Sequence, residues 1–379
     1  MPMLPDPAAT RAAGPVVFHR CADALQPDGH ERTSKAALAR TVADLLERPY
    51  GGDFNPLATY IEQPYFVPSD TLILEAQAQG LGIRNELDLF GGVVPWPFAG
   101  TKAITHELLH PEACAPDGWS ADFGRRVAEV VLPGFTAFTR ADALQAGKRL
   151  LESGPVRLKR PAGVGGRGQA LARDIRQLAS ELDAIDAGEL TRDGIVLECN
   201  LLDVRTFSVG QALLGALLIT YCGTQRLTRA NDGRQVYGGS ELLVARGGWE
   251  ELLALELAPQ TRIAVGQARI YHEAALAAFS GMFASRSNYD VAQGFDDAGV
   301  GRSGVLEQSW RIGGATGAEL AALGAFKADE NLLSVGASTT ECYGDRPELP
   351  DDAVVYYSGT DAQVGPLTKY ARLHPHGDH

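Results

Sequence analysis

The chain has 379 residues, of which 45% are hydrophobic and 21% charged, a composition typical of a globular protein with two or three packed units. Its formal net charge of −13 disfavours a nucleic-acid partner, because phosphate backbones bind to basic surfaces. The five cysteines show no C-x-x-C spacing, residues 1–14 lack the features of a signal peptide, and the longest apolar run is too short to cross a bilayer. We therefore expect a cytoplasmic protein with no membrane partner.

The spacing of apolar residues predicts alternating helices and strands, and therefore an α/β (α+β) fold. Helices are expected over 34–46, 70–79, 140–152, 174–185, 261–279 and 315–326. Strands are expected over 16–18, 155–160, 169–173, 195–199, 206–211, 213–222, 242–245, 288–295 and 304–312. Residues 223–239 are expected to form a polar loop, and the Pro/Asp-rich segment that begins at Pro347 a mobile tail.

The last two expected strands form a hairpin in which two carboxylates face each other. Asp290 and Glu307 are symmetric about the turn at 298–299, so regular antiparallel pairing places them directly opposite, about 5 Å apart at Cβ. Opposed carboxylates repel unless a proton or a cation lies between them, and hard oxygen ligands suit Mg²⁺. An ordinary sheet with one solvated face is the alternative, and a β-bulge would shift the pairing.

Side-chain alternation assigns the remaining residues of this hairpin to two faces. Ser309 and Arg311 are expected on the face of Glu307, with Asn288 opposite Ser309. The opposite, apolar face is expected to pack on a core through Leu306, Trp310 and Ile312.

A strand that delivers Lys159 is followed by a loop with four glycines between 163 and 168. Such a loop lets backbone N–H groups approach phosphate oxygens closely, and Lys159, Arg160 and Arg167 add positive charge. The spacing also matches a dinucleotide fingerprint, but the charged strand and Pro161 disfavour that interpretation. A flexible surface loop is the other alternative.

Taken together, these segments resemble the ATP-grasp superfamily, the biotin carboxylase-like ATP-binding fold. Further stretches at 66–72, 88–95 and 304–314 are similar to a bacterial subgroup of this superfamily with no assigned activity. The resemblance covers roughly residues 15–345. It implies a flexible tail over 1–14, an N-terminal α/β pre-ATP-grasp-like domain over 15–118, an ATP-grasp domain over 119–345 with a lid subdomain at about 155–200, and a C-terminal tail over 346–379.

The resemblance also implies how Mg-ATP would be held. Lys159 would lie near the α- and β-phosphates, and a loop would close over the phosphates through Gly163, Gly165, Gly166, Arg167 and Gly168. Glu198 and the backbone near Leu201 would meet the adenine, and Asp203 would contact the ribose.

The metal and catalytic residues follow from the same resemblance. Asp290 and Glu307 would bind Mg²⁺, Ser309 stands where the superfamily usually has Asn, and Arg311 would face the γ-phosphate. A second lysine of the superfamily is missing from its usual place. The candidate substitutes are Lys102, Arg125 and Arg126.

A separate motif, His106-Glu107-Leu108-Leu109-His110, reads literally as H-E-x-x-H. On a helix, this motif would hold Zn²⁺ between two imidazoles, with Glu107 as general base. Pro111 disfavours helical geometry at His110, and no third ligand is evident. The alternative is an amphipathic helix with two ordinary histidines.

The expected function is an ATP-dependent carboxylate ligase that acts through an acyl-phosphate on a small-molecule or peptide carboxylate, with an amine or thiol as acceptor. Arg226, Arg229 and Arg286 are weak candidates for recruiting the acid, since each is more simply a solvated surface charge. The alternatives are a kinase-type enzyme, a nucleotide-binding protein without turnover, which the departure at Ser309 suggests, and a zinc hydrolase. A homodimer is a further open expectation.

Overall fold

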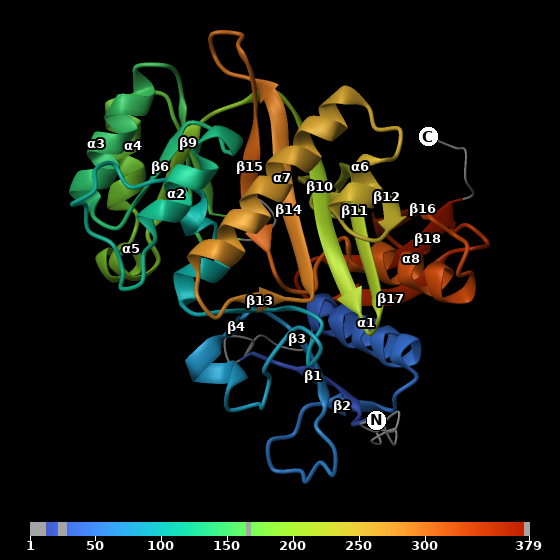
Figure 1. Cartoon of the computed structure of the whole chain (residues 1–379). Helices are drawn as coiled ribbons and strands as arrows, with labels where there is room; N and C mark the ends of the chain where they lie inside the picture. The colour runs from blue at the N-terminus through green and yellow to red at the C-terminus, as the bar shows by residue number, and fades with distance from the viewer. Residues whose placement is uncertain (1–12, 22–28, 164–167, 375–379) are drawn as a thin grey trace.

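The computed structural model describes residues 13–21, 29–163 and 168–374. Within those ranges the strands form four sheets, and no helix is long and apolar enough to cross a membrane. In Figure 1 the N-terminal unit (blue) lies below a large central sheet, and a smaller unit (green) lies beside that sheet.

The N-terminal unit is built on a parallel sheet in the order β2-β1-β3, against which helix α1 packs. Val16 and Phe18 of β1 share a buried cluster with Leu38 and Val42 of α1. The expected strand and helix are confirmed, although the helix begins earlier than expected. The bounds are β1 Val16–His19, α1 His30–Leu46, β2 Tyr50–Asp53 and β3 Tyr65–Pro68.

The helix expected over 70–79 is wrong, because this segment contains a short strand and a π-helix. Strand β4 (Leu72–Ile73) pairs in parallel with β5 (Gly92–Val94), which also pairs with β13 (Phe283–Ala284). The Ile73 backbone nitrogen donates to Gln77 Oε1 at 2.8 Å, just before the π-helix Leu74–Ala78. The partner strand β5 is distant in sequence, so local spacing could not reveal it.

The smaller unit is a four-stranded antiparallel sheet in the order β6-β9-β7-β8, with helices α3 and α4 on one face. Val156, Leu158, Ile195 and Leu197 share a buried cluster with those helices. Because side chains alternate along a strand, Lys159 and Glu198 project from the other face. The bounds are β6 Gly134–Ala137, α3 Arg140–Leu151, β7 Val156–Lys159, β8 Gln169–Ala172, α4 Ile175–Asp183, α5 Ala187–Asp193 and β9 Ile195–Cys199.

Two details of this unit bear on the sequence-based expectations. Asp174 accepts hydrogen bonds from the backbone nitrogens of Arg176 and Gln177, which confirms it as the cap of α4. Strand β6 belongs to the same sheet, so the sheet begins before the expected lid boundary near 155.

The large sheet has, among the described residues, the strand order β15-β14-β10-β11-β12-β16-β18-β17. Helix α7 packs on one face, while α8 and α1 pack on the other, where they share a separate buried cluster. The bounds are β10 Leu202–Leu214, β11 Leu217–Arg229, β12 Gln235–Arg246, α6 Trp249–Leu253, α7 Pro259–Ala278, β14 Arg286–Phe295, β15 Gly301–Ser309, α8 Thr316–Ala328, β16 Ser334–Tyr343, β17 Val354–Asp361 and β18 Gly365–His374.

Two segments expected to be irregular are parts of this sheet. The expected polar loop over 223–239 is wrong, because β11 and β12 remain paired from Ile219↔Arg246 to Arg229↔Gln235. The expected C-terminal tail over 346–379 is also wrong for its described part, because β17 and β18 form the edge of the sheet beyond β16. Both segments are rich in polar residues, and their pairing partners, not their composition, determine that they form strands.

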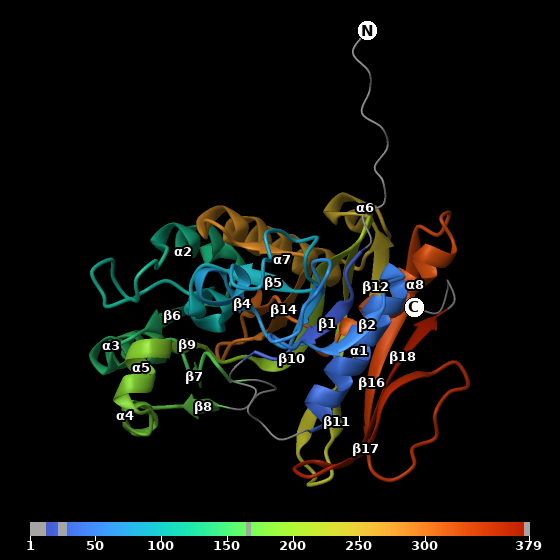
Figure 2. The same cartoon turned by 90° about the horizontal axis from the view of Figure 1, so that it is seen from below.

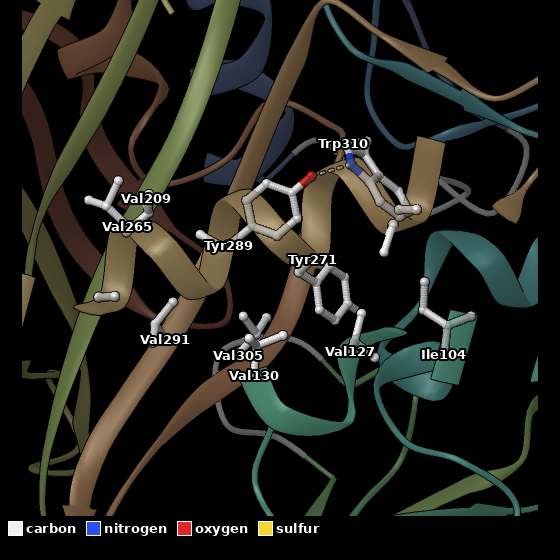
Figure 3. Close-up of a cluster of buried hydrophobic side chains, with 14 of the residues drawn as sticks. Ile104, Val127, Val130, Val209, Val265, Tyr271, Tyr289, Val291, Val305 and Trp310 are labelled. Atoms are coloured by element: carbon white, nitrogen blue, oxygen red, sulfur yellow. Dashed lines mark hydrogen bonds between the residues drawn. The ribbon is translucent and has the colours of Figure 1, made fainter. Parts of the chain in front are cut away.

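Figure 3 shows the core beneath the β14–β15 hairpin, where Tyr289, Val291, Val305 and Trp310 pack together. The indole nitrogen of Trp310 donates a hydrogen bond to the Tyr289 hydroxyl at 3.4 Å. With this apolar face fixed against α7, the polar side chains of the hairpin must lie on the opposite face of the sheet.

A pair of substitutions tests whether the C-terminal strands are part of the folded core. Leu367 of β18 is 1% exposed, whereas Val354 of β17 is 64% exposed. We expect Leu367→Ala to lower the free energy of unfolding by roughly 2–5 kcal/mol. Val354→Ala should change it by less than about 1 kcal/mol. Chemical denaturation monitored by fluorescence measures both, and equal small effects would show that these residues form a tail.

Candidate active site

The predicted pairing of the two carboxylates is confirmed, since Asp290 lies opposite Glu307 and Asn288 lies opposite Ser309. The pairing is irregular just beyond this point, because Val291 pairs with Val305 and leaves Leu306 as an extra residue on β15. Such a bulge changes the direction of the strand and of its side chains.

The bulge overturns the expected orientation of Leu306. Leu306 packs with Leu201 and Ala292 on the carboxylate face, whereas Trp310 lies in the core beneath the hairpin. Leu132 and Cys199 join the same small cluster. The site therefore has an apolar wall next to its carboxylates, and sequence alternation did not predict the contribution of Leu306 to that wall.

Asp290 carries two hydrogen bonds at one carboxylate oxygen. Its Oδ1 accepts from Gln225 Nε2 at 2.8 Å and from Asn288 Nδ2 at 2.9 Å. Burial, reinforced by the negative charge of Glu307, raises the pKa of Asp290 to about 6, although both hydrogen bonds and Lys102 oppose the shift. This carboxylate would be stabilised in its charged form by an additional cation.

Lys102 is the cation closest to the pair. Its side chain is buried, its Nζ forms an ion pair with Glu307, and it donates to the Gly163 carbonyl at 2.8 Å. Lys102 therefore connects the carboxylate hairpin to the beginning of the glycine loop. The other two candidates, Arg125 and Arg126, lie exposed on α2 (Ala121–Val127), where both pair with Asp122.

Lys159 lies in a second buried ionic group on the inner face of the smaller sheet. Its Nζ lies 2.5 Å from Glu198 Oε1, and His106 Nε2 lies 3.3 Å from Glu198 Oε2. Burial alone would raise the pKa of Glu198, but Lys159 and His106 outweigh burial and lower it to about 2. Glu198 is therefore a permanent anion that holds Lys159 in place.

The H-E-x-x-H segment does not form the zinc site that its sequence suggests. Residues 106–110 are not helical, so the amphipathic helix is wrong as well. His106 is buried against Glu198, whereas His110 is half exposed and lies 3.7 Å from Asp142. Across the described part of the chain, no three His, Cys, Asp or Glu residues are placed to hold a metal ion.

The remaining predicted nucleotide contacts are placed as follows. Leu201 is buried in the apolar wall, while Asp203 is exposed at the start of β10, with a left-handed φ of 51°. Gly168, with φ of 72°, ends the glycine loop in a conformation that suits glycine. Three predicted loop residues lie outside the described residues: Gly165, Gly166 and Arg167.

Beyond the carboxylates, Ser309 and Arg311 contact different partners. The Arg311 Nε lies 3.3 Å from Asp70 Oδ1, whereas Ser309 Oγ accepts a hydrogen bond from Arg286 Nη1 at 3.4 Å. Arg286 was expected to be solvated, but it is buried and forms a 2.7 Å ion pair with Glu319. This expectation is wrong because a buried carboxylate on α8 neutralises the guanidinium.

The other two arginine candidates, Arg226 and Arg229, are exposed on β11, so for them the expectation of surface charge is consistent with the structure.

The assembled site offers groups whose chemistry suits an anion and a divalent cation. Two buried lysines, Lys102 and Lys159, supply positive charge, and Asp290 and Glu307 supply paired oxygen ligands. Two carboxylates alone suit Mg²⁺, which typically takes only one or two from the protein and the rest of its ligands from phosphate and water. Ser309 fits that role less well, because its hydroxyl already contacts the Arg286 cation.

Comparisons with known proteins show the family and the fold. Residues 18–371 match the family described as "Protein of unknown function (DUF3182)", and no curated protein matches the chain. The chain is similar in structure to biotin carboxylase from Campylobacter jejuni in a β,γ-ATP complex, with a TM-score of 0.52, 11% identity, and coverage of 96% of this chain and 88% of that chain.

A second solved structure gives the same result. N5-carboxyaminoimidazole synthetase from Staphylococcus aureus, complexed with ADP, matches with a TM-score of 0.51, 11% identity, and coverage of 96% of this chain and 94% of that chain. At such low identity, these similarities establish the fold alone. The chain thus belongs to the DUF3182 family and has an ATP-grasp fold.

Proposed function

We propose that the protein is an Mg-ATP-dependent enzyme that activates a carboxylate substrate as an acyl-phosphate and transfers the acyl group to an amine or thiol. The observation that carries this proposal is the pair of opposed carboxylates, with buried Lys102 ion-paired to Glu307 and buried Lys159 held by Glu198 on the smaller sheet. The similar structures with bound ADP and β,γ-ATP support nucleotide binding.

In this proposal, Lys102 and Lys159 bind phosphate oxygens. The adenine lies against the apolar wall that contains Leu201 and Leu306. Asp290 and Glu307 would hold Mg²⁺, which would supply positive charge near the phosphates. Arg311 stabilises the transferred phosphoryl group by its positive charge.

Two chemical steps follow from this arrangement. A carboxylate oxygen attacks the γ-phosphorus, the bond to the β,γ-bridging oxygen breaks, and ADP leaves. The nucleophile then attacks the acyl carbon, loses a proton, and displaces inorganic phosphate. A kinase-type enzyme would stop after the first step, and a silent nucleotide-binding protein would perform neither.

Removing the charge of Lys159 tests the nucleotide site. Mg-ATP should raise the melting temperature of the wild type, because a ligand that binds only the folded state stabilises it. Lys159→Met should reduce the affinity at least about tenfold, equivalent to about 1.4 kcal/mol. Thermal-shift titrations give each variant's response relative to its own nucleotide-free baseline.

The exposed Lys148 of α3 provides the matched control. Lys148→Met should respond to Mg-ATP like the wild type. An unchanged response of the Lys159→Met variant would remove Lys159 from the nucleotide site.

Asp290 is expected to destabilise the metal-free protein at alkaline pH. Its folded pKa of about 6 lies above the unfolded value of 3.8, so the folded state binds this proton more tightly. Stability is therefore lost as the pH rises from about 4 through 6, by about 3 kcal/mol. We expect Asp290→Asn to raise the melting temperature at pH 8 and to have almost no effect at pH 4.

The same substitution should abolish the Mg²⁺ dependence of ATP binding. In the wild type that dependence should weaken below about pH 6, because protons and Mg²⁺ compete for the carboxylate. Differential scanning calorimetry and ATP titrations across this range measure both effects. A lower melting temperature of the Asp290→Asn variant at pH 8 would contradict the account.

A further inference from the structure

A group of charged side chains extends from Arg311 away from the carboxylate hairpin. Its members come from α1, from the turn after β3, and from β16 and β18. Figure 2 shows α1 alongside the C-terminal strands, which were expected to be a tail. We refer to this group as the charged cluster and define it by Glu31, Lys35, Asp70, Arg311, Glu341 and Lys369.

The end of the charged cluster next to the proposed phosphate site carries net positive charge. Arg311 lies 3.3 Å from Asp70, and Lys35 donates to the Ser69 carbonyl at 2.9 Å. Burial lowers the pKa of Lys35, and the nearby Arg311 lowers it further, whereas Glu31 and Asp70 oppose the shift. Two cations and one anion therefore give this end a formal charge of +1.

The opposite end carries net negative charge. Lys369 is buried, with its Nζ 2.9 Å from Glu341 and 3.5 Å from Glu31. One cation and two anions give this end a formal charge of −1. His30 lies 3.6 Å from Glu31 and reduces this charge only when protonated, while Asp361 accepts from the His30 backbone nitrogen at 2.8 Å.

The accessibility of these groups is uneven. The side chains of Glu31 and Asp70 are 63% and 62% exposed, whereas those of Lys369 and Glu341 are 5% and 11% exposed. The negative end therefore presents a reachable carboxylate, backed by a buried ion pair. Burial raises the pKa of Glu341 even though Lys369 lies beside it, so a further cation would stabilise its charged form.

The charged cluster adjoins the proposed ATP site, because Arg311 lies two residues after Ser309, the last residue of β15. Glu31 interacts electrostatically with Arg311 at one end and with Lys369 at the other. The charges of Asp290 and Glu341 both act on Tyr237, whose hydroxyl hydrogen-bonds with Ser240 and Thr339. Burial raises the pKa of Tyr237 and of Tyr356, so both phenols remain neutral and add no charge.

We propose that the charged cluster binds the carboxylate substrate and selects a small molecule that also carries an ammonium group. This inference rests on the proposed function, because the carboxylate must lie near the γ-phosphate. The substrate carboxylate binds at Arg311 and Lys35, and its ammonium binds between Glu31 and Glu341. A dipolar ligand complements charges of +1 and −1 at opposite ends.

Other substrate classes fit this charge distribution less well. A phosphorylated substrate would bring its negative charge towards Glu31 and Glu341 if it extended along the charged cluster. An apolar acid would leave Glu341 without an added cation and would desolvate polar groups without replacing their partners. The ammonium group is therefore the feature that the negative end of the charged cluster recognises.

The test traps the acyl-phosphate, so it does not depend on the second substrate. The full chain, Mg-ATP and hydroxylamine are incubated with proteinogenic amino acids, β-alanine and 4-aminobutyrate, each paired with its desamino acid. Hydroxylamine attacks the acyl carbon and displaces phosphate, so hydroxamate and ADP form together. We expect at least one amino compound to give hydroxamate, with kcat/KM at least about tenfold above its desamino partner.

Substitutions at the two ends distinguish their roles. Glu31→Gln and Glu341→Gln should each raise KM for the amino compound and reduce its preference over the desamino partner, with little change in kcat. Lys35→Met should raise KM for both members of a pair. Glu330→Gln, at an exposed glutamate outside the charged cluster, should leave kcat and KM unchanged for both members of a pair. Because Glu31 is mostly exposed, its variant should fold even if the Glu341 variant does not.

Several outcomes would overturn the inference. They are equal or better turnover of the desamino acids, an unchanged preference in the Glu31→Gln variant, or no hydroxamate from any amino compound while Mg-ATP still raises the melting temperature. Absence of any Mg-ATP stabilisation is a different result. It would overturn the proposed function itself, and this inference with it.

Discussion

The electrostatic conflict between Asp290 and Glu307 is the constraint on which the rest of the site depends. The apolar face of their hairpin is fixed in the core by Tyr289 and Trp310, so the two carboxylates cannot turn away from each other. Lys102 reduces the repulsion by forming an ion pair with Glu307. Its hydrogen bond to the Gly163 carbonyl links this ion pair to the start of the glycine loop. Burial and, after it, the charge of Glu307 raise the pKa of Asp290, and Lys102 does not offset them. The remaining imbalance makes the site receptive to a divalent cation.

A buried network supports the hairpin from behind. Arg286 pairs with Glu319 of α8, and the Tyr221 hydroxyl lies 2.6 Å from Glu319 Oε1 and 3.0 Å from Asn288 Oδ1. Asn288 in turn donates to Asp290, while Arg286 donates to the Arg311 carbonyl at 2.5 Å. Breaking a buried ion pair on one side typically costs about 3–5 kcal/mol, so this network strongly fixes the backbone around the site. Helix α8 therefore positions both the carboxylate and the arginine of the proposed chemistry.

The sequence predicted the parts of the site that local geometry determines, and it missed those that depend on distant contacts. The Asp290–Glu307 pair follows from the symmetry of a short hairpin, and Lys159 follows from a strand beside a glycine loop. Leu306 could not be placed, because nothing local marks the bulge. The sequence did not distinguish Lys102 from Arg125 and Arg126 as the substitute for the second lysine. The fold does, because it places Lys102 against Glu307. The C-terminal strands were read as a tail because their composition is polar, although they carry Lys369, which pairs with α1 and β16.

Calorimetric titration of ATP into the wild-type protein at pH 8, with and without Mg²⁺, tests the central claim most directly. At this pH Asp290 is ionised, so the two carboxylates are available to the metal. The account predicts binding of one nucleotide per chain in the presence of Mg²⁺ and much weaker binding after the metal is chelated. Absence of binding under both conditions, or equal affinity with and without the metal, would contradict a site built around the opposed carboxylates.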